Sequence, residues 1–183
     1  MHKKSRLRRI AGRSGLPRNT TLRLSLIIHL LGPLKGKTPW WSRVSSLQYT
    51  HTAFELEGRM WDQAIDSVCL VYNADEWCRE KVWTVPRRYA AFRVTTWVDW
   101  PHVVKAVESL EGRHGQRVRT LLRYLKLWPV PSWNCVSSVV IVLEAMGFET
   151  TSETPDELHR FLQLSVEIPT TVSGMGPSVE QIA

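Results

Sequence analysis

Residues 129–146 read PVPSWNCVSSVVIVLEAM, a long apolar run that follows a proline-rich break. Proline ends a preceding helix, and a run that is apolar on every side indicates a helix buried in the core. Asn134 is a favoured N-cap residue, so we expect Cys135 in the first turn. The positive end of a helix favours the thiolate, which is the nucleophilic form, and the Cys135 backbone N–H could hold an oxyanion. A buried, inert cysteine is the alternative interpretation.

The segments around this helix predict an α+β domain. Before residue 100, β-branched and aromatic residues alternate between turn residues, as in strands, and after it apolar residues recur at helical spacing. The expected strands span 22–31 (or a short helix there), 43–57, 60–65, 66–72 and 82–98, broken at Pro86, with a hairpin turn at 57–59. The expected helices span 100–111, 117–127, 135–146 and 155–164, with Gly147 ending the third and Thr154 capping the fourth. We predict a small antiparallel sheet packed against the helix that carries Cys135.

Charge divides the chain into an arm and a body. No acidic residue precedes Glu55, and eleven of the 24 Lys and Arg residues lie in that first part. We expect residues 1–20 to form a basic flexible arm, 21–165 the folded domain, and 166–183 a loose C-terminal tail. A basic arm attracts polyanions such as nucleic acid, anionic lipid or acidic cell-wall polymer, although a solvated tail is an equal alternative. The candidate contacts are Lys3, Lys4, Arg6, Arg8 and Arg9.

Three cysteines without a Cys-x-x-Cys motif argue against a disulfide framework or structural zinc site and fit a reducing compartment. The apolar run at 24–31 lacks the features of a secretory signal and is too short to span a bilayer. We therefore expect a cytoplasmic or virion-associated protein with no transmembrane segment.

A second candidate position is His51, in the strand-like segment Tyr49-Thr50-His51-Thr52-Ala53-Phe54-Glu55. A strand would hold the imidazole rigidly, and a nucleophile and its base are often distant in sequence but adjacent in space. A structural histidine is the alternative. The competing histidines, which lack this strand context and are expected to be structural or surface residues, are His29, His102, His114 and His159.

The order of these features resembles the circularly permuted papain-like superfamily, which includes lecithin retinol acyltransferase-like, YiiX-like and permuted NlpC-type proteins. An early strand His is followed twelve residues later by a polar residue, here Gln63-Ala64, and much later by an Asn-Cys pair, here Asn134-Cys135. The Gly turn at 147 and the segment Pro155-Asp156-Glu157-Leu158 also match. The resemblance covers about residues 22–165, and each of its motifs is short.

The resemblance implies a cysteine peptidase or amidase-like hydrolase that cleaves an amide, peptide or ester bond without a metal or organic cofactor. It assigns Cys135 as nucleophile, His51 as general base and Gln63 as the residue that orients His51. Peptidoglycan or protein substrates, in a phage or bacterial setting, follow by analogy. Val136-Ser137-Ser138 departs from the acyltransferase pattern, so acyl transfer is less supported.

The sequence leaves two points undecided: which residue orients His51, and which residues line a substrate groove. Gln63 is neutral, and Asp62 and Glu55 are alternatives. Strand alternation places Asp62 and Gln63 on opposite faces, so one of them should point away from His51. Trp133, Trp128, Asn134 and Tyr49 could line a substrate groove, or the Trp residues could pack on the Cys helix. Two rival hypotheses are a non-catalytic nucleic-acid-binding or virion structural protein that uses the arm, and a catalytically decayed scaffold.

Overall fold

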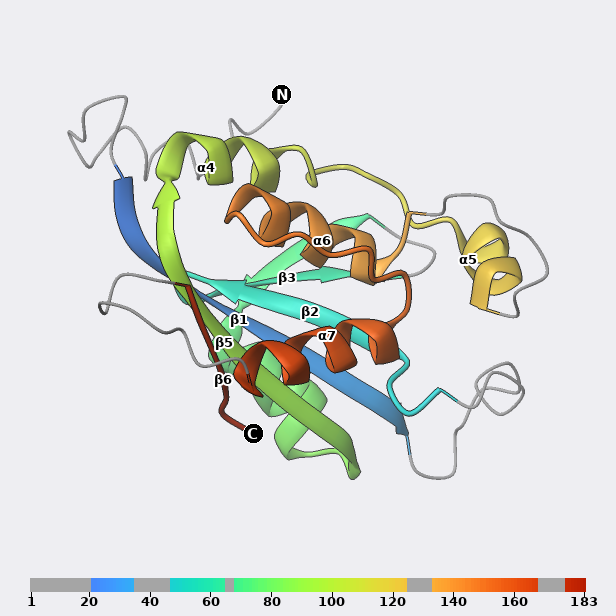
Figure 1. The fold of residues 1–183 in the computed structure, drawn as a ribbon. Coiled ribbons are helices and arrows are strands. Elements are labelled where there is room, and N and C mark those ends of the chain that lie inside the picture. Colours follow the sequence, from blue (N-terminus) through green and yellow to red (C-terminus); the bar gives the residue numbers. More distant parts are fainter. Residues whose placement is uncertain (1–20, 35–46, 65–67, 125–132, 168–176) are drawn as a thin grey trace.

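A six-stranded antiparallel sheet forms the centre of the structure (Figure 1). The computed structural model describes residues 21–34, 47–64, 68–124, 133–167 and 177–183. The strands lie in the order β4-β3-β2-β1-β5-β6. Their bounds are β1 (Thr21–Leu34), β2 (His51–Leu56), β3 (Arg59–Gln63), β4 (Cys69–Asn73), β5 (Arg87–Asp99) and β6 (Ser178–Gln181). The α+β class predicted from the sequence is confirmed.

Helices cover both faces of this sheet. They are α3 (Ala74–Cys78), the π-helical segment η1 (Arg79–Trp83), α4 (Trp100–Glu108), α5 (Arg117–Tyr124), α6 (Cys135–Ala145) and α7 (Pro155–Glu167). Figure 1 shows α4, α6 and α7 in front of the sheet and the α3 segment behind it, with α5 set to one side. The helix that carries Cys135 therefore packs on the sheet.

The main core lies between the sheet and its α4, α6 and α7 side. Strand residues such as Phe54 and Phe92 meet Val139 of α6 and Leu158 of α7, and all four side chains are fully buried. Burying one such side chain contributes roughly 1.5–3 kcal/mol. A smaller cluster on the opposite face joins Leu31, Ala53 and Met60 of the sheet to Ala74, Trp77 and Cys78 of α3.

Local signals placed several element ends correctly. Asn134 caps α6, and Gly147 ends it with φ 87°, a left-handed conformation that favours glycine. Thr154 Oγ1 accepts from Glu157 N–H at the start of α7. β2 and β3 form the expected hairpin through Glu57 and Gly58, which both have positive φ, as a two-residue type I′ turn requires.

Three predicted segments differ in the structure. The strand expected over 43–57 begins at His51, and the described residues 47–50 before it are not in a strand. Residues 74–83 were not expected to be helical, although Asn73 caps α3 by accepting from Glu76 N–H at 3.1 Å. The C-terminal segment is not wholly a loose tail: α7 continues to Glu167, and β6 pairs with β5. A four-residue strand carries no alternation long enough to read, so its pairing with β5 determines it. Within the described residues, no helix is long and apolar enough to cross a membrane.

Candidate active site

The N-terminus of α6 presents Cys135 at the edge of the core. Asn134 Oδ1 accepts from Val136 N–H at 2.9 Å and from Ser137 N–H at 3.0 Å, and Ser137 Oγ accepts from Asn134 N–H at 3.3 Å. This reciprocal capping box fixes the first turn. Asn134 accepts hydrogen bonds from the N–H groups of the second and third helical residues. The N–H of the first helical residue, Cys135, donates no hydrogen bond to Asn134. Cys135 itself is only 6% exposed.

The β2–β3 hairpin places His51 and Asp62 on the same face of the sheet. Its two-residue turn sets Leu56 opposite Arg59 and Ala53 opposite Asp62. In this register His51 and Asp62 are diagonal neighbours, two residues apart along the ladder, and diagonal neighbours on one face are within reach of long side chains. Gln63 is one residue further along β3, so it points to the other face.

His51 and Asp62 are joined by a short hydrogen bond that a second donor supports. His51 Nε2 donates to Asp62 Oδ1 at 2.7 Å, and Trp77 Nε1 of α3 donates to Asp62 Oδ2 at 2.8 Å. Both carboxylate oxygens are therefore used, and the carboxyl plane is fixed between a strand and a helix. This arrangement fixes the His51 ring and leaves Nδ1 as its second functional atom.

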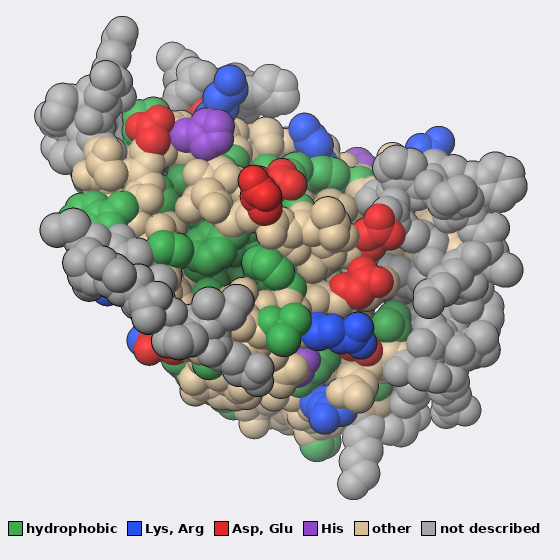
Figure 2. All heavy atoms as spheres, viewed as in Figure 1, with side chains coloured by type: hydrophobic (Ala, Val, Ile, Leu, Met, Phe, Trp, Pro, Cys, Tyr) green, Lys and Arg blue, Asp and Glu red, His purple; other side chains and the backbone are tan. Residues whose placement is uncertain are grey.

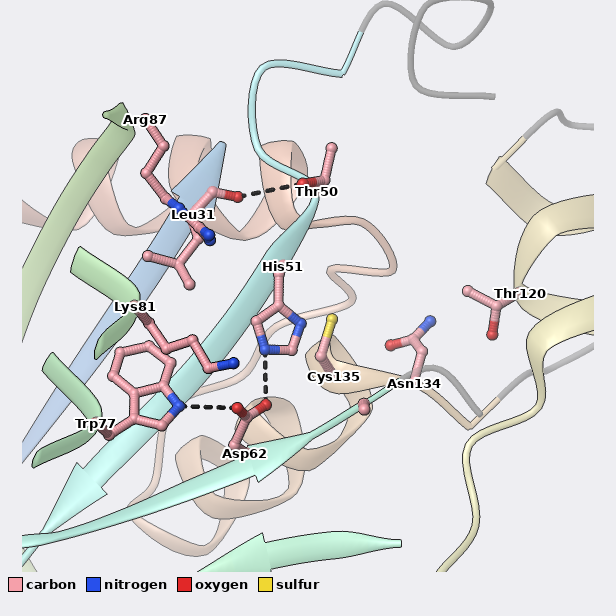
Figure 3. Close-up of a pocket in the computed structure, with 11 residues that line it drawn as sticks. Leu31, Thr50, His51, Asp62, Trp77, Lys81, Arg87, Thr120, Asn134 and Cys135 are labelled. Atoms are coloured by element: carbon pink, nitrogen blue, oxygen red, sulfur yellow. Dashed lines mark hydrogen bonds and ion pairs between the residues drawn. The ribbon is translucent and has the colours of Figure 1, made fainter. Parts of the chain in front are cut away.

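The imidazole lies between an acid and a thiol. Figure 3 shows the Cys135 sulfur beside the His51 ring, on the side of the ring that carries Nδ1. Burial alone would lower the pKa of His51, but hydrogen bonding with Asp62 and Cys135, together with their negative charges, raises it from 6.5 to about 10. The ring is therefore an imidazolium at neutral pH, which places a positive charge beside the Cys135 sulfur.

The acid is held in its ionised form. Burial works against the charge of Asp62, but the hydrogen bond and charge of His51, the Trp77 hydrogen bond and the charge of Lys81 lower the Asp62 pKa overall. Asp62 is therefore a carboxylate at neutral pH, where His51 is charged.

These groups open onto one pocket with a volume of about 320 Å³. His51, Asp62 and Cys135 line it, together with Asn134, Thr50, Ala64 and Thr120. Leu31 and Trp77 supply apolar wall, and Lys81 and Arg87 supply positive charge. The pocket is large enough for a group the size of one amino-acid residue, directly over the sulfur and the imidazole (Figure 3).

Asp62 occupies the place that the resemblance assigned to Gln63, so the assignment of Gln63 as the residue that orients His51 is corrected. Gln63 is buried, and its side chain bonds to Ala64 O at 3.0 Å and accepts from Trp133 Nε1 at 3.1 Å. Trp133 stands two residues before Cys135. The two neighbours on β3 thus have separate tasks: Asp62 positions His51, and Gln63 holds the segment that leads into the cysteine.

The predicted groove residues divide in a similar way. Among the described residues that line the pocket, Asn134 is present, but Tyr49 and Trp133 are not. Tyr49 is buried, its ring lies 4.6 Å from the His159 ring, and its backbone N–H donates to Asp156 Oδ1 of α7 at 2.7 Å. The Trp133 ring lies under the Arg113 guanidinium at 4.4 Å. Trp128 lies outside the described residues.

The other histidines have ordinary surroundings. His29 is buried and bonds to Tyr89 Oη at 2.9 Å, with Glu55 at 3.6 Å. Glu55, an alternative partner of His51 in the sequence, is therefore beside a different histidine. His102 and His114 are exposed, and His159 packs between aromatic rings.

Sequence reasoning missed the roles of Trp77, Lys81 and Arg87 and ranked Asp62 below its neighbour. The signal for Asp62 was present: a two-residue turn at Glu57-Gly58 fixes the hairpin register, and that register selects Asp62 over Gln63. The other three residues come from segments that only the tertiary fold brings to the pocket, so they carried no local signal.

The basic arm, with Lys3, Lys4, Arg6, Arg8 and Arg9, lies outside the described residues. The face drawn in Figure 2 carries acidic and basic side chains interspersed with apolar ones. No protein-family model, no curated protein and no solved structure matches the chain.

Proposed function

We propose that this chain is a cysteine hydrolase that cleaves an amide or ester bond through an acyl-enzyme on Cys135. The observation that carries the proposal is the His51 ring, which lies between the Asp62 carboxyl group and the Cys135 sulfur in one pocket. A nucleophile beside a base, with the base held by a third residue, is the general arrangement of sites that catalyse nucleophilic acyl transfer. The permuted papain-like topology is part of the same proposal, supported by a Cys-bearing helix packed on an antiparallel sheet.

The first half-reaction uses the thiolate and the helix end. Cys135 Sγ attacks the substrate carbonyl carbon, and the electron pair of the C=O bond moves to oxygen. The Cys135 N–H and the positive end of α6 stabilise this oxyanion. His51 Nδ1 then gives its proton to the leaving amine or alcohol, the bond to that group breaks, and a thioester remains on Cys135.

In the second half-reaction, which hydrolyses the thioester, His51 accepts a proton instead of donating one. His51, now neutral, takes a proton from a water molecule, whose oxygen attacks the thioester carbon. Collapse of the intermediate releases the carboxylic acid and restores the thiolate and the imidazolium. An alcohol or amine in place of water would make the same site an acyltransferase. By the resemblance noted above, peptide bonds of peptidoglycan or protein are the proposed substrates.

A burst experiment with 4-nitrophenyl acetate tests the proposal. We expect rapid release of about one equivalent of nitrophenolate and an acetyl adduct that peptide mapping places on Cys135. Cys135→Ala should abolish both, whereas Cys78→Ala, which removes a buried cysteine on α3, should leave them unchanged. Absence of a burst in folded protein, or an adduct distributed over Cys69, Cys78 and Cys135, would support a non-catalytic scaffold instead.

A further inference from the structure

Two basic side chains line the pocket from segments that the proposed reaction does not otherwise use. Lys81 comes from η1, and Arg87 is the first residue of β5. Figure 3 shows Lys81 extending its amine toward His51 and Asp62, with Arg87 on the Leu31 side of the pocket. The two cations therefore approach the site from different elements.

Among the residues that the structure describes, neither Lys81 nor Arg87 forms an ion pair with a carboxylate. Within the described residues, the ion pairs are His29–Glu55, His51–Asp62 and Arg93–Glu180, and none includes Lys81 or Arg87. Asp62 is the acidic residue of the pocket lining, and both of its oxygens already accept hydrogen bonds. After His51 has been paired with Asp62, the positive charges of Lys81 and Arg87 therefore have no negative partner among the described residues.

Among the described residues, Arg87 gives the clearest sign of a missing hydrogen-bond acceptor. Its Nε is buried and, among the described residues, has no hydrogen-bond partner. Burial also lowers the pKa of its guanidinium. An unsatisfied buried donor on a charged group is costly, and natural structures rarely keep one without a reason. An acceptor that enters the pocket with the substrate would satisfy it.

The charges of the pocket lead to the same conclusion. In the ion pair of the proposed reaction, the charges of the Cys135 thiolate, the His51 imidazolium and the Asp62 carboxylate sum to minus one. Lys81 and Arg87 bring the total charge of the pocket lining to plus one. Lys81 helps to keep Asp62 ionised, but Arg87 has no such role. Because Leu31 and Trp77 form apolar walls beside these charges, the field inside the pocket is stronger than at an open surface.

We propose that the pocket binds a carboxylate of the substrate against Arg87 and Lys81, next to the carbonyl that Cys135 attacks. The inference rests on the proposed function and narrows its substrates to acyl compounds or peptides that carry a carboxylate close to the bond that breaks. An acidic side chain or a C-terminal carboxylate fits a space of about 320 Å³. The planar guanidinium of Arg87 suits the two oxygens of such a group.

A pair of alkylating reagents tests the inference without knowledge of the substrate. Iodoacetate and iodoacetamide transfer groups of similar size to the same sulfur, but only iodoacetate carries a carboxylate. The measured quantity is the ratio of their second-order rates at Cys135, followed by peptide mapping. Because both reagents need the thiolate, this ratio cancels changes in thiol reactivity and reports on the anion subsite.

We expect the ratio to favour iodoacetate in the wild-type chain and to fall about tenfold in Arg87→Gln, with a similar fall in Lys81→Gln. Arg88→Gln is the matched control: it removes the same charge from the next residue, whose guanidinium lies near the Tyr49 ring and not in the pocket lining. That variant should keep the wild-type ratio.

The outcomes separate the two proposals. Fast labelling of Cys135 by iodoacetamide, with a ratio that Arg87→Gln and Lys81→Gln leave unchanged, would overturn the carboxylate subsite and leave the hydrolase proposal intact. The same unchanged ratio together with protection of Cys135 by inorganic phosphate would assign the cations to a phosphate instead. Labelling by both reagents as slow as that of Cys78 would overturn the hydrolase proposal and the subsite with it.

Discussion

Replacing Asp62 by Asn removes the charge beside His51 while changing little of the shape. The two Asp62 oxygens accept from His51 Nε2 at 2.7 Å and from Trp77 Nε1 at 2.8 Å. An amide has one oxygen, so it can satisfy only one of these N–H groups and must turn its own N–H toward the other. The variant therefore loses both the charge and one hydrogen bond.

The size of the effect follows from the titration of His51. Its pKa of about 10 stands well above the unperturbed 6.5, and Asp62 is the leading cause of the rise. One pKa unit is about 1.36 kcal/mol, so the net rise corresponds to roughly 5 kcal/mol in favour of the imidazolium, with the cost of burial already subtracted. Without the Asp62 charge, fewer interactions oppose the effect of burial, so the pKa of His51 should fall and less of the imidazolium should remain at neutral pH.

The assay is alkylation of Cys135 by iodoacetamide near neutral pH. An ordinary thiol is only about 3% thiolate at about pH 7, so loss of the imidazolium should slow labelling by about tenfold to thirtyfold. Cys69 and Cys78 serve as internal references, because burial raises their pKa values to about 12 and about 11. NMR of the imidazole should show the fall in the His51 pKa directly.

Asp75→Asn is the matched control, since it removes an exposed carboxylate from the first turn of α3. It should label like the wild-type chain. If folded Asp62→Asn also labels at the wild-type rate, or if the His51 pKa stays near 10 in that variant, the role given to Asp62 is wrong.

Three further predictions address the cap, the corrected role of Gln63 and the dependence on pH. Asn134→Ala should lower the free energy of unfolding by ~1 kcal/mol, because two first-turn N–H groups lose their acceptor, and Asn134→Ser should recover most of it in urea denaturation. Gln63→Leu should slow Cys135 alkylation severalfold by releasing Trp133, yet leave the NMR titration of His51 unchanged; a large shift in that titration would restore Gln63 as the orienting residue. A His51 pKa that is raised on folding contributes stability that is fully present below about pH 6.5 and is lost as the pH rises through about 10. The wild-type advantage over His51→Gln in unfolding free energy should therefore shrink between those values, and an advantage that grows with pH would contradict the assignment.

The sequence predicted the parts of the site that depend on neighbouring residues. The Asn134 cap, the first-turn position of Cys135 and the hairpin turn at Glu57 and Gly58 are all determined by residues a few positions away, so local chemistry was sufficient. The helix is rich in β-branched residues, which have lower helix propensity. Its proline break, its cap and its burial against the sheet outweigh that propensity.

The site residues that the sequence predicted wrongly or missed depend on strand register or on tertiary contacts. Spacing taken from a family resemblance favoured Gln63, whereas the two-residue turn at 57–58 places Asp62 beside His51. The α3–η1 segment was missed, and with it Trp77 and Lys81, because a helix of five residues gives too few turns for a periodic signal. Arg87 begins a strand, and nothing in its neighbourhood indicates that β5 delivers it to the pocket of Cys135.

The most direct test of the central claim is selective alkylation of the wild-type chain by iodoacetamide at about pH 6, where ordinary thiols are almost entirely protonated. If His51 and Cys135 form an ion pair, Cys135 should be labelled well before Cys69 and Cys78, and His51→Ala should abolish the preference. Equal, slow labelling of the three cysteines, unchanged by His51→Ala, would contradict the account.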